Sequence, residues 1–294
     1  MSKRVKVYFD GEGLGDTIGW MGQVERYQKI TGNEVYVFCK FNDIFAPDNI
    51  KVSPKNSPLV EKTYDESFVI GYCGWQRPSN LRNEVKDIKA SGLMQMASEI
   101  LGLEDFKEVK PVLNIKPKNI KLKRRTVSIA SLTTMQQKFW NYKGGWNAVI
   151  SHLKKKGIDT ISIDGDSQFG AGYPLGDIPA FNPIPSASKD KTGLSLQKAA
   201  NYIQKSVFFM GLASGLSWLA WALDKPVVMI LGSVAADYHF SNPYVVQNKN
   251  VCHDCWRNHD MVGDEWYWCP EDKNFECSRQ ITPEMVIEKI NTLL

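Results

Sequence analysis

The hydrophobic pattern of the chain is clearest between residues 207 and 233, where three apolar runs follow one another with short polar breaks. Val207 to Met210 and Val227 to Leu231 are short runs that predict two strands. Between them, Leu216 to Leu223 is apolar nearly all round and predicts a buried helix, with Ser214 at its N-cap in the polar turn Ser214–Ser217. Two strands joined by one helix are expected to be parallel, so this turn lies at the carboxyl end of a strand.

Strand and helix patterns alternate in the same way through the rest of the chain. The expected strands are residues 3–9, 34–40, 68–73, 126–130 and 160–163, and the expected helices are residues 17–30, 92–103, 146–155 and 194–203. Residues 50–66 and 169–192 are rich in residues that favour turns and are expected to be irregular. The alternation predicts an α/β protein made of doubly wound, Rossmann-like domains.

The length of 294 residues exceeds the usual size of one domain, which favours two domains. We place an N-terminal domain at residues 1–118, a linker at 119–125 and a C-terminal domain at 126–294, with the two domains facing each other across a cleft. Hydrophobic residues make up 43% of the chain, enough for two cores.

Composition and charge narrow the class of protein further. No uninterrupted apolar run reaches the roughly 18 residues that span a bilayer, and the charged start MSKRVKVYFDGEG lacks the apolar region of a signal peptide. We therefore expect a cytoplasmic protein without membrane contact. The formal net charge of +4 permits an acidic partner without requiring one.

A glycine-rich turn follows the first expected strand, and it carries the first candidate site. Gly13 and Gly15 lie in this turn and Asp16 stands at the entrance of the next helix. The spacing is not the G-x-G-x-x-G pattern of dinucleotide-binding proteins. Asp16 has two possible roles at this stage, compensation of the helix dipole or proton transfer to and from a ligand.

Hydroxyl groups and a lysine follow two strands of the second half. Thr133, Thr134 and Lys138 come after the strand at 126–130, and Ser214 to Ser217 come after the strand at 207–210. In a parallel sheet these turns share one edge, where hydroxyls, N–H groups and an ammonium suit a pyrophosphate. With Asp16 opposite, the set suits a reaction in which a carboxylate deprotonates an attacking hydroxyl while a nucleoside diphosphate leaves.

The chain has six cysteines, of which Cys39 and Cys73 are isolated and expected in the core. The other four lie close together near the C-terminus, begin with a C-x2-C pair and predict a tetrahedral metal site in a finger at residues 252–277. They are Cys252, Cys255, Cys269 and Cys277. Free thiols or disulfides are the alternatives to a metal site. His253 and His259 are alternative ligands, but four thiolates suffice without them. Zinc is the metal that thiolate tetrahedra suit by default, with iron as the other choice.

Four segments, taken together in this order, resemble the bacterial autotransporter heptosyltransferases, which are ADP-heptose-dependent enzymes of the two-domain GT-B fold related to the lipopolysaccharide heptosyltransferases. They are GLGD at 13–16, TTMQQKFW at 133–140, SGLSWLAWALDKPVV at 214–228 and WYWCPEDKNFECSRQITPEMVIEKI at 266–290. The likeness extends from about Val5 to Ile290. Where the lipopolysaccharide enzymes have Asp and His around the third segment, this chain has Ala213 and Trp218, which favours the autotransporter branch.

The resemblance implies a role for each candidate residue. Asp16 would be the general base in the acceptor-side N-terminal domain, and Lys138 would neutralise the donor diphosphate in the nucleotide-sugar-binding C-terminal domain. The residues expected at the donor are Gly13, Gly15, Thr133, Thr134, Lys138, Ser214, Gly215, Leu216 and Ser217. The metal held by the four cysteines would be structural, with iron favoured over zinc.

The resemblance also implies an activity, which is transfer of heptose from ADP-heptose to a serine hydroxyl of a protein. Two alternatives remain, a glycosyltransferase that modifies a hydroxymethylated base of viral DNA, and a non-catalytic subunit that binds a nucleotide sugar. The resembling enzymes assemble into a large ring, so a homo-oligomer is possible. Their extra N-terminal domain is expected to be missing, since this chain opens at the first strand of the catalytic fold.

Overall fold

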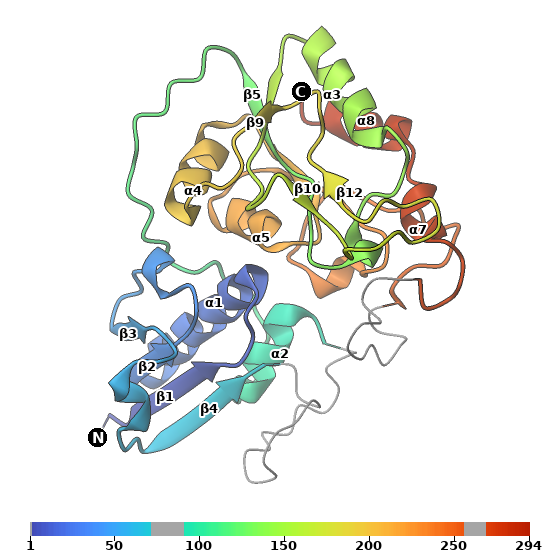
Figure 1. Cartoon of the computed structure of the whole chain (residues 1–294). Helices are drawn as coiled ribbons and strands as arrows, with labels where there is room; N and C mark the ends of the chain where they lie inside the picture. The colour runs from blue at the N-terminus through green and yellow to red at the C-terminus, as the bar shows by residue number, and fades with distance from the viewer. Residues whose placement is uncertain (1, 72–90, 256–268) are drawn as a thin grey trace. The chain divides into compact units, whose positions relative to one another are not determined.

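The computed structural model of the chain describes residues 2–71, 91–255 and 269–294, and they divide into two compact units (Figure 1). The N-terminal unit is Met1–Lys116 with Tyr238–Phe240, and the C-terminal unit is Pro117–Asp237 with Ser241–Leu294. Within the described residues no helix combines the length and the apolar character that a membrane span needs. Each unit is built around a parallel sheet, as the alternating pattern predicts.

The N-terminal unit has a four-stranded sheet in the order β3-β2-β1-β4. Its strands are β1 (Arg4–Phe9), β2 (Glu34–Phe38), β3 (Ile50–Ser53) and β4 (Glu66–Ile70). Every pairing between them is parallel. The order changes direction between β1 and β4, so the turn that follows β1 lies where open α/β sheets bind ligands.

Two helices pack against each other in this unit, α1 (Leu14–Thr31) and α2 (Leu93–Ile100). α1 ends at Gly32, whose φ of 66° gives the left-handed conformation of a helix C-cap. An extended segment, residues 107–114, runs along α1. A Cβ at Gly22 would collide with the carbonyl oxygen of Val109, so glycine permits this close approach.

The C-terminal unit has a six-stranded parallel sheet in the order β12-β11-β10-β5-β6-β9. Its strands are β5 (Thr126–Ala130), β6 (Asp159–Ser162), β9 (Lys189–Asp190), β10 (Phe209–Leu212), β11 (Val227–Ile230) and β12 (Val245–Val246). Counted in chain order, this is the 3-2-1-4-5-6 arrangement of dinucleotide-binding folds. A small antiparallel pair, β7 (Gln168–Phe169) and β8 (Asn182–Pro183), lies outside it.

Helices cover both faces of this sheet, as the prediction of a doubly wound domain requires (Figure 1). α3 (Gly145–Lys155) and α8 (Pro283–Asn291) pack together over one face, in a core with Val127 and Ile129. α4 (Leu196–Lys205) and α5 (Gly215–Ala222) pack together on the strands' other side, where Ser128 Oγ meets Ser206 Oγ at 2.6 Å. Alternate residues of β5 therefore pack against two different helix layers, one on each face of the sheet.

Short helical turns complete the described residues. They are η1 (Asn42–Ile44), η2 (Pro58–Glu61), η4 (Gln136–Lys138), η5 (Ala236–Tyr238) and α7 (Glu276–Arg279).

The sequence-based expectations differ from the structure at several element boundaries. Residues 50–53 form β3 inside a stretch expected to be irregular, and residues 283–291 form α8, which the pattern analysis did not identify. α1 begins at Leu14, before the expected residue 17. β10 runs through Gly211 to Leu212, two residues beyond the expected end. A Cβ at Gly211 would lie only 2.7 Å from the Phe209 ring, so glycine leaves space for that ring. Cys39 is buried as expected, and Cys73 lies outside the described residues.

Candidate functional site

The candidate donor site lies where the strand order of the C-terminal unit changes direction, between β5 and β10. β5 and β10 are parallel neighbours, with Ile129 beside Met210. Their carboxyl ends therefore lie side by side at one edge of the sheet. In folds of this order, ligands bind outside that edge at the point of reversal. The turns that follow the two strands contain the residues that the sequence predicts for the diphosphate.

The turn after β5 is held by a buried carboxylate from the neighbouring strand. Asp164 follows β6, is 2% exposed, and accepts the N–H groups of Ser131 and Leu132 at 3.0 and 2.9 Å. Burial raises the pKa of the Asp164 carboxyl to about 6, and these two N–H groups act against the rise. Asp164 thus fixes the backbone directly before Thr133. Asp164 is not among the residues that the sequence predicts for the site, although its position just after a strand is a signal that could have identified it.

The same turn continues into η4, which carries Lys138. Thr133 is buried at 8% exposure, Thr134 is exposed and Lys138 is partly buried. The backbone of Lys138 is fixed by its N–H bond to the carbonyl of Met135 at 3.0 Å. The structure therefore brings the two threonines and the lysine onto one short segment at the expected edge of the sheet.

The turn after β10 leads directly into the N-terminus of α5. Ser214 is the N-cap residue in extended conformation, but its side chain makes no capping hydrogen bond, contrary to the expectation of a side-chain cap. The first N–H groups of a helix have no partner within it, so those of Gly215 and Leu216 point out of the helix end. With the helix dipole they form a site suited to an anion.

Ser217 differs from its neighbours in this turn. Its side chain is 0% exposed and its hydroxyl donates to the carbonyl of Leu212 at 2.6 Å. That bond joins the end of β10 to the first turn of α5. Ser217 therefore supports the turn from inside.

In the N-terminal unit, Asp16 lies in the first turn of α1 and is partly buried. Its carboxylate folds back over the glycine turn after β1. A Cβ at Gly13 would lie 2.5 Å from Asp16 Oδ2, and one at Gly11 would lie 3.1 Å from it. The glycines thus leave the space that the carboxylate occupies. Gly15, expected in this turn, is instead a buried residue of α1.

Two lysines flank the glycine turn at the ends of the neighbouring strands, which the sequence analysis did not identify. Lys55, after β3, donates to the carbonyl of Asp10 at 3.1 Å and forms an ion pair with Glu12. Lys40, after β2, pairs with the same carboxylate at 3.2 Å. The two lysines, Lys55 first, lower the pKa of the exposed Glu12 carboxyl. This cluster anchors the turn that precedes Asp16.

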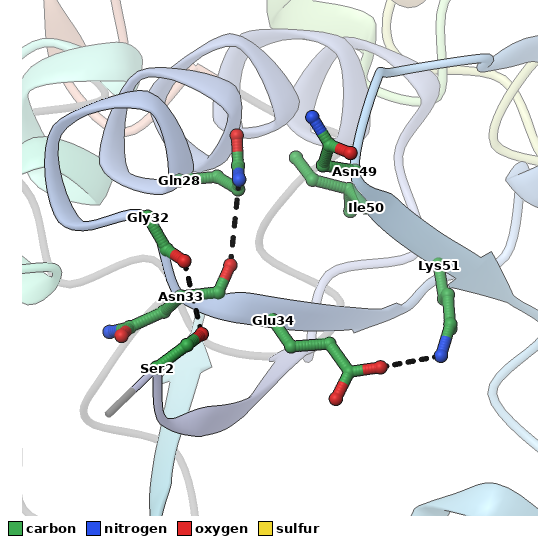
Figure 2. A pocket seen from close by; sticks show the side chains of 8 residues that line it. All are labelled: Ser2, Gln28, Gly32, Asn33, Glu34, Asn49, Ile50 and Lys51. Atoms are coloured by element: carbon green, nitrogen blue, oxygen red, sulfur yellow. Dashed lines mark hydrogen bonds and ion pairs between the residues drawn. The ribbon is translucent and has the colours of Figure 1, made fainter.

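A hollow of about 620 Å³ lies in the same unit, at the amino ends of β2 and β3 (Figure 2). Figure 2 shows Glu34 and Lys51 joined across one side of it, with their charged atoms 2.6 Å apart. Ser2 and Gln28 line the other side. The hollow lies at the sheet edge opposite the Asp16 turn and contains none of the predicted site residues, so it is not the candidate site.

The four C-terminal cysteines are free thiols. Burial raises the pKa of Cys255 and of Cys277 to about 12, and the neighbouring thiols add to the rise. Cys269 Sγ accepts the N–H of Lys273 at 3.4 Å, a contact that suits a thiolate. Within the part of the chain that the structure describes, however, no three metal-ligating side chains form a group able to hold an ion. Residues 256–268 of the expected finger, including His259, lie outside the described residues.

The backbone around these cysteines is held in unusual conformations. Residues with φ between 49° and 64° stand beside them, although none is glycine. They are Asp254, Asp272, Asn274 and Phe275. A positive φ costs free energy for a residue other than glycine, and it persists only where the surrounding structure fixes it. Ligation of a metal by tightly turning loops is one way to fix it. The thiol chemistry and the tight turns fit a bound thiophilic metal.

Comparison with known proteins places these features in a family context. Residues 191–266 match glycosyltransferase family 9 (heptosyltransferase). The chain is 34% identical over 302 residues to the autotransporter heptosyltransferase TibC of Escherichia coli O78:H11, covering 98% of this chain and 71% of TibC. It is equally similar, at 34%, to the autotransporter heptosyltransferase BAHTCr of Citrobacter rodentium, covering 98% of this chain and 70% of that protein.

The same likeness appears in solved structures. A crystal structure of TibC, described as an iron-containing dodecameric glycosyltransferase, matches with a TM-score of 0.87 at 33% identity, over 99% of this chain and 76% of TibC. A second TibC structure, in complex with ADP-D-beta-D-heptose, matches with a TM-score of 0.88 at 32% identity, with the same coverage. The predicted family resemblance and the predicted α/β glycosyltransferase fold are confirmed.

Proposed function

Because the chain belongs to the autotransporter heptosyltransferases, we propose that it transfers heptose from ADP-heptose to a serine hydroxyl of a protein. That the chain is a glycosyltransferase follows from its family. The identity of the donor, the acceptor and the residues that act on them are the parts that we propose. The donor proposal is supported by TibC, which has been crystallised with ADP-heptose.

The observation that carries the donor assignment is the pair of turns at the reversal point of the C-terminal sheet. Backbone N–H groups at Gly215 and Leu216 would bind the diphosphate, and the hydroxyl of Ser214 has no capping bond to give up. The ammonium of Lys138 would offset the charge that develops on the leaving ADP. Thr133 and Thr134 would add neutral hydrogen bonds, with Thr134 the more accessible.

Asp16 is proposed as the general base. Its carboxylate lies at the carboxyl edge of the sheet of the N-terminal unit, over a turn whose glycines leave room for it. The cluster of Glu12, Lys40 and Lys55 fixes that turn from the side. Asp16 would accept the proton of the acceptor hydroxyl as its oxygen attacks the sugar carbon and the bond to ADP breaks.

The test is an assay of ADP release from ADP-heptose with candidate acceptors, followed by mass spectrometry of the acceptor. Asp16→Asn keeps the side-chain volume and removes the proton acceptor, so turnover should fall about 10²–10⁴-fold with ADP affinity nearly unchanged. Asp43→Asn, an exposed acid in the first turn of η1, is the matched control. Normal turnover of Asp16→Asn would refute its role as base.

The acceptor is decided in the same assay. A mass increase of one heptose on serine of a protein acceptor supports the proposal. Modification of hydroxymethylated DNA in place of protein would refute the proposed protein acceptor and leave the proposed glycosyl transfer standing. If no ADP is released from ADP-heptose while another nucleotide sugar is hydrolysed or used for transfer, the proposal that ADP-heptose is the donor is refuted.

We further propose that Cys252, Cys255, Cys269 and Cys277 hold one structural iron ion, with zinc as the alternative. TibC is iron-containing, and the thiols and tight turns of this chain suit such an ion. A tetrahedral set of thiolates leaves no open position, so the metal would stabilise the fold and take no part in transfer. Elemental analysis of the purified protein decides between iron, zinc and neither.

TibC is also dodecameric, and on that ground we propose that this chain forms a homo-oligomer. Light scattering after size-exclusion chromatography measures the mass directly. A particle of 33.3 kDa, the mass of one chain, would refute the proposal.

A further inference from the structure

The segment that carries Cys277 packs directly against the segment that carries Lys138. The two meet beside Gly232, just after β11. A Cβ at Gly232 would lie 3.0 Å from the Ser278 Cβ, 3.4 Å from the Cys277 Sγ and 3.5 Å from the carbonyl oxygen of Gln137. Glycine leaves the room that this close contact between α7 and η4 requires.

A chain of short hydrogen bonds joins the same two segments. Asn141 Nδ2 donates to Ser278 Oγ at 2.8 Å, and Gln136 Nε2 donates to Asn141 Oδ1 at 2.6 Å. Asn141 Nδ2 also lies 3.2 Å from the carbonyl oxygen of Phe139. Gln136 and Ser278 are each 1% exposed. Since buried polar groups lose free energy when a partner is removed, this network favours one arrangement of η4.

Two further contacts restrain the same turn. Trp140 Nε1 donates to the carbonyl of Ile281 at 2.8 Å in a buried setting. Gln136 Oε1 accepts a hydrogen bond from Asn182 Nδ2 at 3.1 Å, so both ends of the Gln136 amide are fixed. Residues 136–141 are therefore bonded to α7 and the residues just after it on one side, and to β8 on the other.

We infer that Asn141 is a positioning residue for donor binding, which links Ser278 in the cysteine segment to the turn that carries Lys138. Asn141 would not touch the donor. It would hold Gln136, two positions before Lys138, against a segment whose own position depends on Cys277. The inference rests on the proposed donor role of Lys138 and on the proposed metal at the cysteines.

A double-mutant cycle tests the link. ADP binding is measured by calorimetry at 25 °C for the wild type, Asn141→Ala, Ser278→Ala and the double variant. Each single variant should bind ADP about 5- to 10-fold more weakly, and the double variant should bind no more weakly than the weaker single one, because the two side chains act through one bond. Asn147→Ala, which removes hydrogen bonds with Ser186 and Ala187 at a partly buried position on α3, should bind ADP normally.

Metal content and melting temperature are measured on the same samples. A purely structural role of Asn141 would lower the melting temperature and leave the Kd for ADP unchanged, and that result would overturn the inference. Additive effects in the double variant would also overturn it. If Asn141→Ala does not fold, Asn141→Asp is the second variant, because it keeps the acceptor for Gln136. It removes the Nδ2 donor to Ser278, together with the weaker bonds of that Nδ2 to the carbonyls of Phe139 and Gln136, and the same Kd criterion applies.

Removal of the metal from the wild type gives an independent arm. Treatment with a chelator should weaken ADP binding by a similar factor, and the Asn141→Ala protein should lose less affinity on the same treatment. Equal losses in both proteins would contradict the link. A wild type that does not bind ADP at all would refute the proposed function, whereas a wild type and variant that bind ADP equally would refute only this inference.

Discussion

Replacing Glu25 with glutamine is expected to stabilise the protein above neutral pH. Glu25 lies on α1, is 3% exposed and accepts the N–H of Val112 at 2.8 Å. Burial raises the pKa of its carboxyl from 4.5 to about 7, against the opposing effects of the Val112 hydrogen bond and of Lys29. The carboxylate is therefore ionised at pH 8 in a place that favours its neutral form.

The magnitude follows from the two pKa values. A change in pKa from 4.5 to about 7, at about 1.4 kcal/mol for each tenfold change in proton affinity, amounts to at most about 3.5 kcal/mol. Because the folded state holds the proton more tightly than the unfolded state, the stability that Glu25 contributes is fully present below pH 4.5. It is lost as the pH rises from 4.5 to about 7. Glutamine keeps an oxygen for Val112 and carries no charge, so it avoids this loss.

Urea unfolding at a series of pH values from 5 to 8 measures the effect, with the exchange rate of the Val112 amide as a local probe. Glu25→Gln should be more stable than the wild type at pH 8, and the difference should shrink towards pH 5. The matched control is Glu99→Gln, which changes an exposed acid on α2 that accepts hydrogen bonds from Ser91 and Gln95. A Glu25→Gln protein that is less stable at pH 8, by an amount independent of pH, would refute the reasoning.

Three further changes probe the C-terminal unit. Asp164→Asn should weaken ADP binding about 10-fold, because the amide NH2 would face the N–H of Ser131 or Leu132, donor against donor. Unchanged affinity by calorimetry would show that the turn needs no carboxylate. Lys138→Ala should weaken ADP binding by about 1.5–3 kcal/mol, the range for a charge-assisted contact, and an unchanged Kd rules the contact out. Cys252→Ser combined with Cys255→Ser should abolish the bound metal in elemental analysis and reduce soluble yield, and full metal content in this variant would argue against the four-cysteine site.

The apolar runs determined the central strands of both sheets. β1, β2, β5 and β11 all fall within the expected ranges to within a few residues, because a buried strand needs a run of apolar residues whatever surrounds it. β3 was missed since its four residues, IKVS, are mostly only partly buried and lie among turn-forming residues. The start of α1 was predicted too late because glycine, at positions 13 and 15, has a low helix propensity. In the structure the helix nevertheless begins at Leu14.

The candidate residues themselves were also found in the sequence. Glycines next to Asp16, hydroxyls next to Lys138 and a clustered set of cysteines are local patterns, and the structure places the first two sets at the carboxyl ends of strands. Ser217 shows the limit of such patterns. Its type and position suit a phosphate, yet its hydroxyl is buried in a bond to Leu212.

Only the tertiary structure decided which distant residues support these segments. Asp164 reaches the β5 turn because β6 pairs with β5, and Asn141 reaches Ser278 because α7 packs beside β11. Glu25 is buried because residues 107–114 run along α1. Local composition sets which residues can form a strand, a helix or a ligand, whereas a buried hydrogen bond depends on which segment folding brings opposite, and that is a property of the packed chain as a whole.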